Sequence, residues 1–256
     1  MEPIPGRLRM LRGERELSQA YNRWGIELNG PERDQKAWRT LPKKPFDPFV
    51  EEVKDERGDY FALRSSAFDG IVTSKEVHRA ATPLFSILNV AMSMNGDANP
   101  VTKGPVIEFV PDGQPRKHHD LEAEAGTMRL RGGIATITLR DAQGIVIEPS
   151  LAPSKTQLWM RAAALEPAIG SALRYLEGKP GWIELYKAHE AIGGLPNGGI
   201  SNNEISRFTQ TANYEKRHHT SDKTKPHKRP MDLWKARALI TSWIAAAIDD
   251  ILVKNP

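Results

Sequence analysis

The chain has 256 residues, of which 39% are hydrophobic and 27% charged, so it can bury a sizeable core beneath a charged surface. No run approaches the roughly 20 apolar residues of a membrane-spanning helix, and the first ten residues lack an apolar signal core. The absence of cysteine excludes disulfides, thiolate nucleophiles and cysteine zinc sites, and it favours a reducing cytoplasmic location.

The first half of the chain predicts mixed α and β structure. Short apolar runs bounded by turn residues are typical of strands, and Gly132-Gly133 favours a tight hairpin. Pro42, Pro45 and Pro48 indicate an extended connector. The later runs lie close together along the chain, which indicates an antiparallel meander. We expect strands at 24–28, 60–64, 106–110, 127–131, 134–139 and 145–147.

One long helix interrupts these strands. Ser74 is a candidate N-cap, and Pro83 should either kink the helix or mark its start. Apolar residues follow at spacings of three and four, which predicts a stripe that faces the sheet. The stripe consists of Val77, Ala80, Ala81, Leu84, Leu88 and Ala91.

The second half predicts helices only. Ser154 can cap a helix that Pro167 kinks and Gly178 ends, and further helices are expected at 181–192, 201–214 and 231–254. The predicted fold class is therefore α+β: residues 1–150 form an N-terminal antiparallel sheet with a long helix, and residues 151–256 form an all-α helical bundle.

The positive charge is concentrated in one segment. Residues 215–230 hold six basic and two acidic side chains, so this segment carries the whole net charge of +4. Such a patch attracts anions. The candidate anion-binding residues are Asn213, Lys216, Lys223, Lys225, Lys228 and Arg229.

The same segment holds groups that could perform chemistry on a phosphodiester. Arg217 can bind a phosphate with two hydrogen bonds, while His218 and His219 can exchange protons near neutral pH. Glu190, if it faces the bundle, needs a cationic partner such as Arg217 or Arg207. Trp182 and Trp234, at helix starts, are the candidates for stacking on a base.

No cofactor or metal is expected. The chain has neither a GxxxxGK[ST] phosphate loop nor a GxGxxG turn. The adjacent pairs His118-His119 and His218-His219 each offer one well-placed ligand, since neighbouring side chains point apart. Metal sites usually need three convergent ligands.

The run WIELYKAHEAI at 182–192, followed by a helix ending in Thr211-Ala212-Asn213 and then Arg217-His218, resembles a HEPN-type helical domain. The resemblance covers about residues 155–256 and implies a four- or five-helix unit, often dimeric. Many such domains are metal-independent ribonucleases of defence or toxin–antitoxin systems, and others only bind RNA. It implies that Glu190 is the acidic site residue and that Arg217 with His218 or His219 stands near the arginine–histidine motif, although the family has four to six residues between the two.

The leading hypothesis is thus a protein that binds RNA or another polyanion and is a candidate metal-independent endoribonuclease. A second hypothesis is a non-enzymatic interaction or dimerisation module whose basic loop is solvated. A third is a small-ligand sensor, with a closed pocket between the helix at 77–88 and the hairpin at 127–139.

Overall fold

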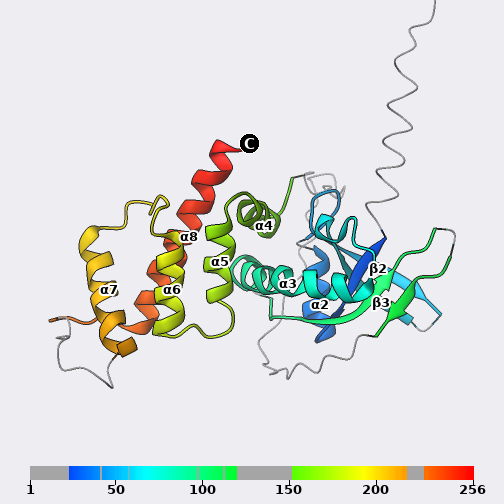
Figure 1. Cartoon of the computed structure of the whole chain (residues 1–256), viewed down its shortest axis with the longest axis horizontal. Helices are drawn as coiled ribbons and strands as arrows, with labels where there is room; N and C mark the ends of the chain where they lie inside the picture. The colour runs from blue at the N-terminus through cyan, green and yellow to red at the C-terminus, as the bar shows by residue number, and fades with distance from the viewer. Residues whose placement is uncertain are drawn as a thin grey trace, which may run out of the picture. The chain divides into compact units, whose positions relative to one another are not determined.

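The computed structural model (Figure 1) describes residues 23–40, 42–56, 58–96, 98–111, 113–119, 152–217 and 228–256; the side chains of Gly96, Lys216 and Arg217 are not described. The chain divides into two compact units. The sheet unit comprises Met1–Phe85 and Asn95–Gln157, and the helical unit comprises Ser86–Met94 and Leu158–Pro256. The predicted α+β class is confirmed. The domain boundary predicted at 150–151 lies outside the described residues.

The sheet unit is built on a five-stranded antiparallel sheet with the order β2-β3-β1-β4-β5. Ile26 pairs with Leu63 on one side and with Val106 on the other, and all three are fully buried. The central strand therefore lies with its apolar face in the core. The strands are β1 (Trp24–Asn29), β2 (Phe49–Asp55), β3 (Gly58–Arg64), β4 (Thr102–Glu108) and β5 (Arg116–His118).

The strands predicted at 24–28 and 60–64 are confirmed, and the one predicted at 106–110 is β4, which starts earlier and ends at Glu108. Strand β2 and the short β5 were not predicted. The strands predicted at 127–131, 134–139 and 145–147, with their hairpin and the pocket of the ligand-sensor hypothesis, lie outside the described residues.

Two helices complete the core of the sheet unit. Helix α2 (Glu32–Thr40) places Trp38 at 5.9 Å from Phe85 of helix α3 (Ser74–Gly96), with the rings stacked. Helix α3 continues through Pro83 and contributes residues to both units. Its N-cap is Thr73 rather than the predicted Ser74, because Thr73 exchanges hydrogen bonds with Glu76: the Glu76 amide donates to the hydroxyl at 3.3 Å, and the hydroxyl donates to the carboxylate at 2.8 Å.

The helical unit continues with α4 (Lys155–Leu165), α5 (Pro167–Tyr175), α6 (Trp182–Ile192), α7 (Asn202–Arg217) and α8 (Leu233–Lys254). Ser154 caps α4 as predicted, accepting a hydrogen bond from the Gln157 amide at 3.2 Å. Pro167 does not kink one helix but starts a second, because it occupies the first turn of α5 while Glu166 caps it.

The core of the helical unit consists of the predicted apolar stripes. Leu173 of α5, Leu185 of α6, Phe208 of α7 and Ile240 of α8 are fully buried and belong to one hydrophobic cluster. Burial of such side chains stabilises the fold by about 1.5–3 kcal/mol each. Among the helices that the structure describes, none is long and apolar enough to cross a bilayer.

Candidate functional site

The predicted site lies where α7 ends and the chain enters α8. Arg217 is the last residue of α7, and of Lys216 and Arg217 only the helical backbone is described. Lys228 and Arg229 are exposed just before α8. Asn213 is half-buried in the last turns of α7. The predicted residues His218, His219, Lys223 and Lys225 lie outside the described residues.

The chain returns to α8 beside the middle of α7. The Met231 amide donates to the Thr211 hydroxyl at 3.0 Å, and the Arg207 guanidinium donates to the carbonyls of Arg229 and Pro230 at 2.7 and 2.9 Å. These contacts hold the residues before α8 against α7. They bring the Arg229 backbone against Arg207, so Arg207 and the consecutive residues Lys228 and Arg229 gather here from two separate parts of the sequence.

Glu190 does not lie at this end of the helical unit. Helices α6 and α7 run in opposite directions (Figure 1). Phe208 of α7 packs near His189, at 5.4 Å between ring centroids, and Glu190 follows His189 near the end of α6. Arg217 lies nine residues beyond Phe208, or about 13 Å further along α7, toward the start of α6. The exposed Glu190 and the Arg217 backbone are thus at opposite ends of the helix pair.

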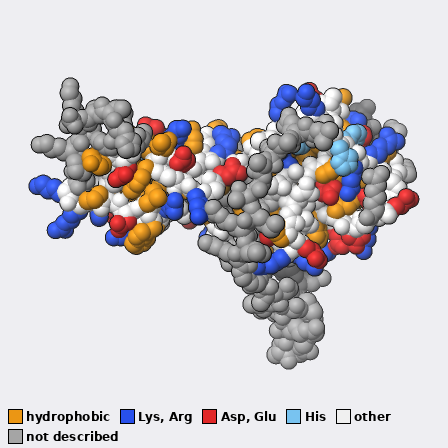
Figure 2. Space-filling model, turned by 90° about the horizontal axis from the view of Figure 1, so that it is seen from below, with side chains coloured by type: hydrophobic (Ala, Val, Ile, Leu, Met, Phe, Trp, Pro, Cys, Tyr) orange, Lys and Arg blue, Asp and Glu red, His pale blue; other side chains and the backbone are white. Residues whose placement is uncertain are grey.

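A groove between α7 and α8 opens next to the gathered cations. Its volume is about 310 Å³, and the indole of Trp234 on its wall is 65% exposed. The Lys235 ammonium lies 5.2 Å from the centroid of that indole and 3.3 Å from the Asp232 carboxylate. Figure 2 shows hydrophobic side chains beside lysine and arginine on the helical unit. The groove is lined by Ile200, Glu204, Arg207, Met231, Trp234, Lys235, Ala238, Leu239 and Ser242.

The groove lining holds two basic side chains, Arg207 and Lys235, and one acidic side chain, Glu204; Lys235 shares its charge with the exposed Asp232. Arg207 donates to carbonyl oxygens, which are neutral acceptors, so these hydrogen bonds do not cancel its charge. Glu204 is the acidic residue of the lining, and it caps α7: its carboxylate accepts from the Ser201 hydroxyl at 2.8 Å. Its negative charge therefore lies at the start of α7, where it offsets the positive end of the helix dipole.

His189, rather than Glu190, points into the helical unit. Its ring lies 5.3 Å from Trp243, 5.4 Å from Phe208 and 6.0 Å from Tyr186. The Nδ1 atom is buried with no hydrogen-bond partner among the described residues. Burial lowers the pKa of His189, and the charge of Glu190 only partly opposes this. The helical period indicates this position, because His189 shares a face with the buried Leu185 and Ile192.

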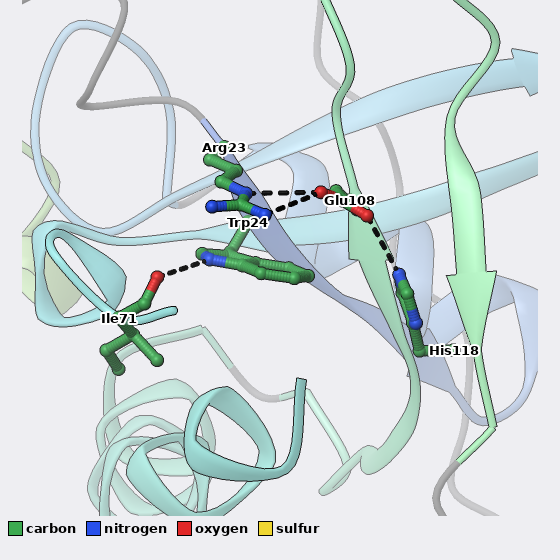
Figure 3. Close-up of polar contacts among 5 residues, drawn as sticks. All are labelled: Arg23, Trp24, Ile71, Glu108 and His118. Carbon is green, nitrogen blue, oxygen red and sulfur yellow. Dashed lines mark hydrogen bonds and ion pairs between the residues drawn. The ribbon is translucent and has the colours of Figure 1, made fainter. Parts of the chain in front are cut away.

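The sheet unit holds a second polar cluster, centred on Glu108 (Figure 3). Arg23 donates to one carboxylate oxygen at 2.9 and 3.1 Å, and His118 Nε2 lies 3.1 Å from the other. Since the carboxylate only accepts, the imidazole proton is on Nε2. The His118 ring meets Trp24 edge-on at 5.7 Å, and the Trp24 indole donates to the Ile71 carbonyl at 2.8 Å. The cluster ties β5 to β4 and β1.

Two opposing effects act on the pKa of Glu108 in this cluster. Burial by itself raises the pKa of Glu108, but the hydrogen bonds and charges of Arg23 and His118 outweigh it and lower that pKa. A metal site would need further ligands beside His118. The described residues contain no group of three His, Asp or Glu side chains that could hold a metal ion.

No family model, curated protein or solved structure matches this chain. The HEPN-like resemblance therefore stays a prediction. Of the residues predicted for the site, the structure brings Arg229 against Arg207, which lines the groove with Trp234, and it separates Glu190 from Arg217.

Proposed function

We propose that this protein binds RNA or a similar polyanion through the helical unit, at the surface formed by α7 from Arg207 onward, the residues before α8 and the first turns of α8. We call this surface the basic surface. Its described side chains are Arg207, Lys228, Arg229 and Lys235, and we assign Lys216 and Arg217 to it from their place in the sequence at the end of α7. The observation that carries the proposal is that Arg207 is bound to carbonyls of the very segment whose sequence holds the net charge of the chain.

The basic surface combines residue types that bind a phosphate backbone with one that can stack on a base. Arginine and lysine bind phosphate oxygens and release counterions from a polyanion, which makes affinity strongly dependent on salt. The described cations come from α7, from the residues before α8 and from α8, and so can contact successive phosphates. Trp234 adds an exposed aromatic ring to these basic surroundings, and that combination is typical of proteins that bind single strands.

The test is a charge-removal variant of the basic surface, with Lys216, Arg217, Lys228 and Arg229 each changed to Gln. Affinity for a fluorescent RNA is measured by anisotropy at 50 and 200 mM salt. We expect the wild type to lose affinity steeply with salt, and the variant to lose at least tenfold at the lower salt and to show a shallower salt dependence.

The matched control removes the same charge from the sheet unit, by changing Lys36, Arg39, Lys44 and Lys54 to Gln. These side chains are more than half exposed and pair with carboxylates. RNA affinity should change less than threefold. Equal losses in the two variants would reduce the effect to net charge and contradict a defined surface.

Ribonuclease activity is the catalytic extension of this proposal, and its support is the sequence Arg217-His218-His219 alone. One histidine would remove the 2′-hydroxyl proton so that this oxygen attacks phosphorus, the bond from phosphorus to the 5′-oxygen would break, and the other histidine would protonate that oxygen, while Arg217 stabilises the charge on the phosphoryl oxygens. Incubation of the purified protein with RNA in EDTA tests it. Products that disappear in the variant His218→Ala, with RNA affinity retained, would support catalysis; intact RNA would leave binding alone.

A further inference from the structure

The α7–α8 groove has a chemical character that phosphate binding does not require. Lysine and arginine suffice for a phosphate backbone, whereas the wall of this groove is an indole with 65% of its surface exposed. Tryptophan combines a large apolar ring with a polar N–H group, and it is enriched where proteins bind partners. The exposed ring therefore indicates an occupant with an apolar or aromatic part.

We propose that the groove between α7 and α8 stacks an unpaired nucleobase of a single-stranded nucleic acid on Trp234, while Arg207 and Lys235 contact the flanking phosphates. This inference deepens the proposed function and rests on it. It specifies which form of the polyanion is preferred: a strand with accessible bases, over a duplex whose bases are already stacked.

The dimensions and charges fit this occupant. A volume of about 310 Å³ is at the small end of the range for ligand pockets, which suits one base with part of its backbone. Leu239, Ala238 and Met231 supply an apolar floor beside the indole. Arg207 and Lys235 line the same groove, so a base that enters brings its phosphates to two cations.

The backbone that carries Trp234 is held in place by its surroundings. It lies in the first turn of α8, directly after Asp232 and Leu233, and the preceding backbone is held to α7 by Arg207 and Thr211. Because the backbone of a regular helix is already ordered, binding a base to a ring on it costs less conformational entropy than ordering a loop would.

The experiment compares three probes with the wild type and the variant Trp234→Ala: a ten-nucleotide single-stranded RNA, the duplex of the same sequence and inorganic polyphosphate. We expect a loss of about tenfold for the single strand and less than twofold for the duplex and for polyphosphate. Trp234→Phe should restore most of the affinity for the single strand. Single-stranded DNA of the same sequence should lose as much as the RNA, because every base has a stacking face.

Tyr175→Ala is the matched control. Tyr175 is also an exposed aromatic residue of the helical unit, at 37% exposure, with the Lys187 ammonium 5.7 Å from its ring centroid, but it does not line the groove. Its loss should leave all three affinities unchanged. Thermal unfolding followed by circular dichroism verifies that each variant folds.

The outcomes separate the two proposals. If the wild type binds the single strand and Trp234→Ala binds it equally well, or loses affinity equally for polyphosphate, base stacking is overturned while the basic surface stands. If the wild type binds none of the three probes, the proposed function itself falls. Self-association that Trp234→Ala abolishes, without an effect on single strands, would assign the groove to a second copy of the chain and overturn stacking.

Discussion

Arginine has different acceptors in the two units. In the sheet unit, Arg23, Arg39 and Arg64 bind the carboxylates of Glu108, Glu52 and Glu51. In the helical unit, Arg207 and Arg237 bind backbone carbonyls, with Arg237 donating to Pro180 at 2.9 Å. Both arrangements satisfy the hydrogen-bonding capacity of the guanidinium.

Only a carboxylate acceptor neutralises the charge of the arginine. A carboxylate contributes a full negative charge, whereas a carbonyl contributes a dipole, so an arginine bound to carbonyls is still an electrostatic attractor for anions. The acceptor of each basic side chain, as well as the number of basic residues, therefore decides where a protein can bind a polyanion.

The largest effect is expected at Glu51. The Arg64 side chain is 6% exposed, binds Glu51 and lies 3.6 Å over the Phe109 ring, and burial lowers its pKa. The variant Glu51→Gln leaves the buried guanidinium with a neutral acceptor. We expect a loss of about 2–3 kcal/mol in the free energy of unfolding, measured with urea, and no change in RNA affinity.

Glu52→Gln is the control at the adjacent position of β2. Its partner Arg39 is 54% exposed, so solvent screens the ion pair and the loss should be within about 1 kcal/mol. If both variants lose the same stability, burial of Arg64 does not set the strength of its ion pair, and the contrast between neutralised and attracting arginines weakens.

The response to acid should separate the two units next. The pKa of His189 is lowered by burial, so the unfolded chain binds its proton more readily. Stability from this group is complete above the ordinary histidine pKa of about 6.5 and falls as the pH drops below it, by at most about 1.4 kcal/mol per pH unit. Glu108 behaves differently: its pKa is lowered from 4.5, so its contribution persists until the pH falls below that value.

The pH dependence of stability in each unit can be measured by hydrogen exchange resolved by peptide. Between pH 7 and 5, after correction for intrinsic exchange rates, α6, α7 and α8 should lose protection while β1 and β4 keep theirs. The variant His189→Phe removes the titrating group and keeps an aromatic ring, so it should flatten the pH dependence of α6–α8. A dependence that survives in this variant would assign it to another group.

Local patterns predicted most of the secondary structure. The strands at 24–28 and 60–64 and the helices at 181–192, 201–214 and 231–254 follow from hydrophobic period and capping residues, which act within a few residues of sequence. Strand β2 was missed because its sequence FVEEVKD is dominated by charge; the ion pairs of Glu51 and Glu52 that accommodate it come from distant parts of the chain. Three-residue β5 carries too short a pattern.

The candidate site was predictable in charge but not in contacts. The sequence alone indicates the excess of cations at 215–230, and it offers Trp182 and Trp234 as candidates for stacking on a base. It does not show that Arg207 holds the carbonyls of Arg229 and Pro230, because this contact requires the chain to return alongside α7. The sequence offered Arg217 or Arg207 as a partner for Glu190 if Glu190 faced the bundle; Glu190 is exposed, and the opposite directions of α6 and α7 place it apart from the Arg217 backbone.

The smallest effect is expected at Glu108, whose partners are partly exposed. The Arg23 and His118 side chains are 49% and 36% exposed, so solvent weakens both interactions. Glu108→Gln should lower the free energy of unfolding by about 1 kcal/mol at low salt, and by less in 0.5 M salt because the screened pairs contribute less there. A double-mutant cycle with Arg23→Gln isolates the pair, and a coupling of about 0.5 kcal/mol is expected. A loss that is independent of salt and shows no coupling would mean that packing around Trp24, rather than neutralisation of Arg23 by a carboxylate, stabilises this edge of the sheet.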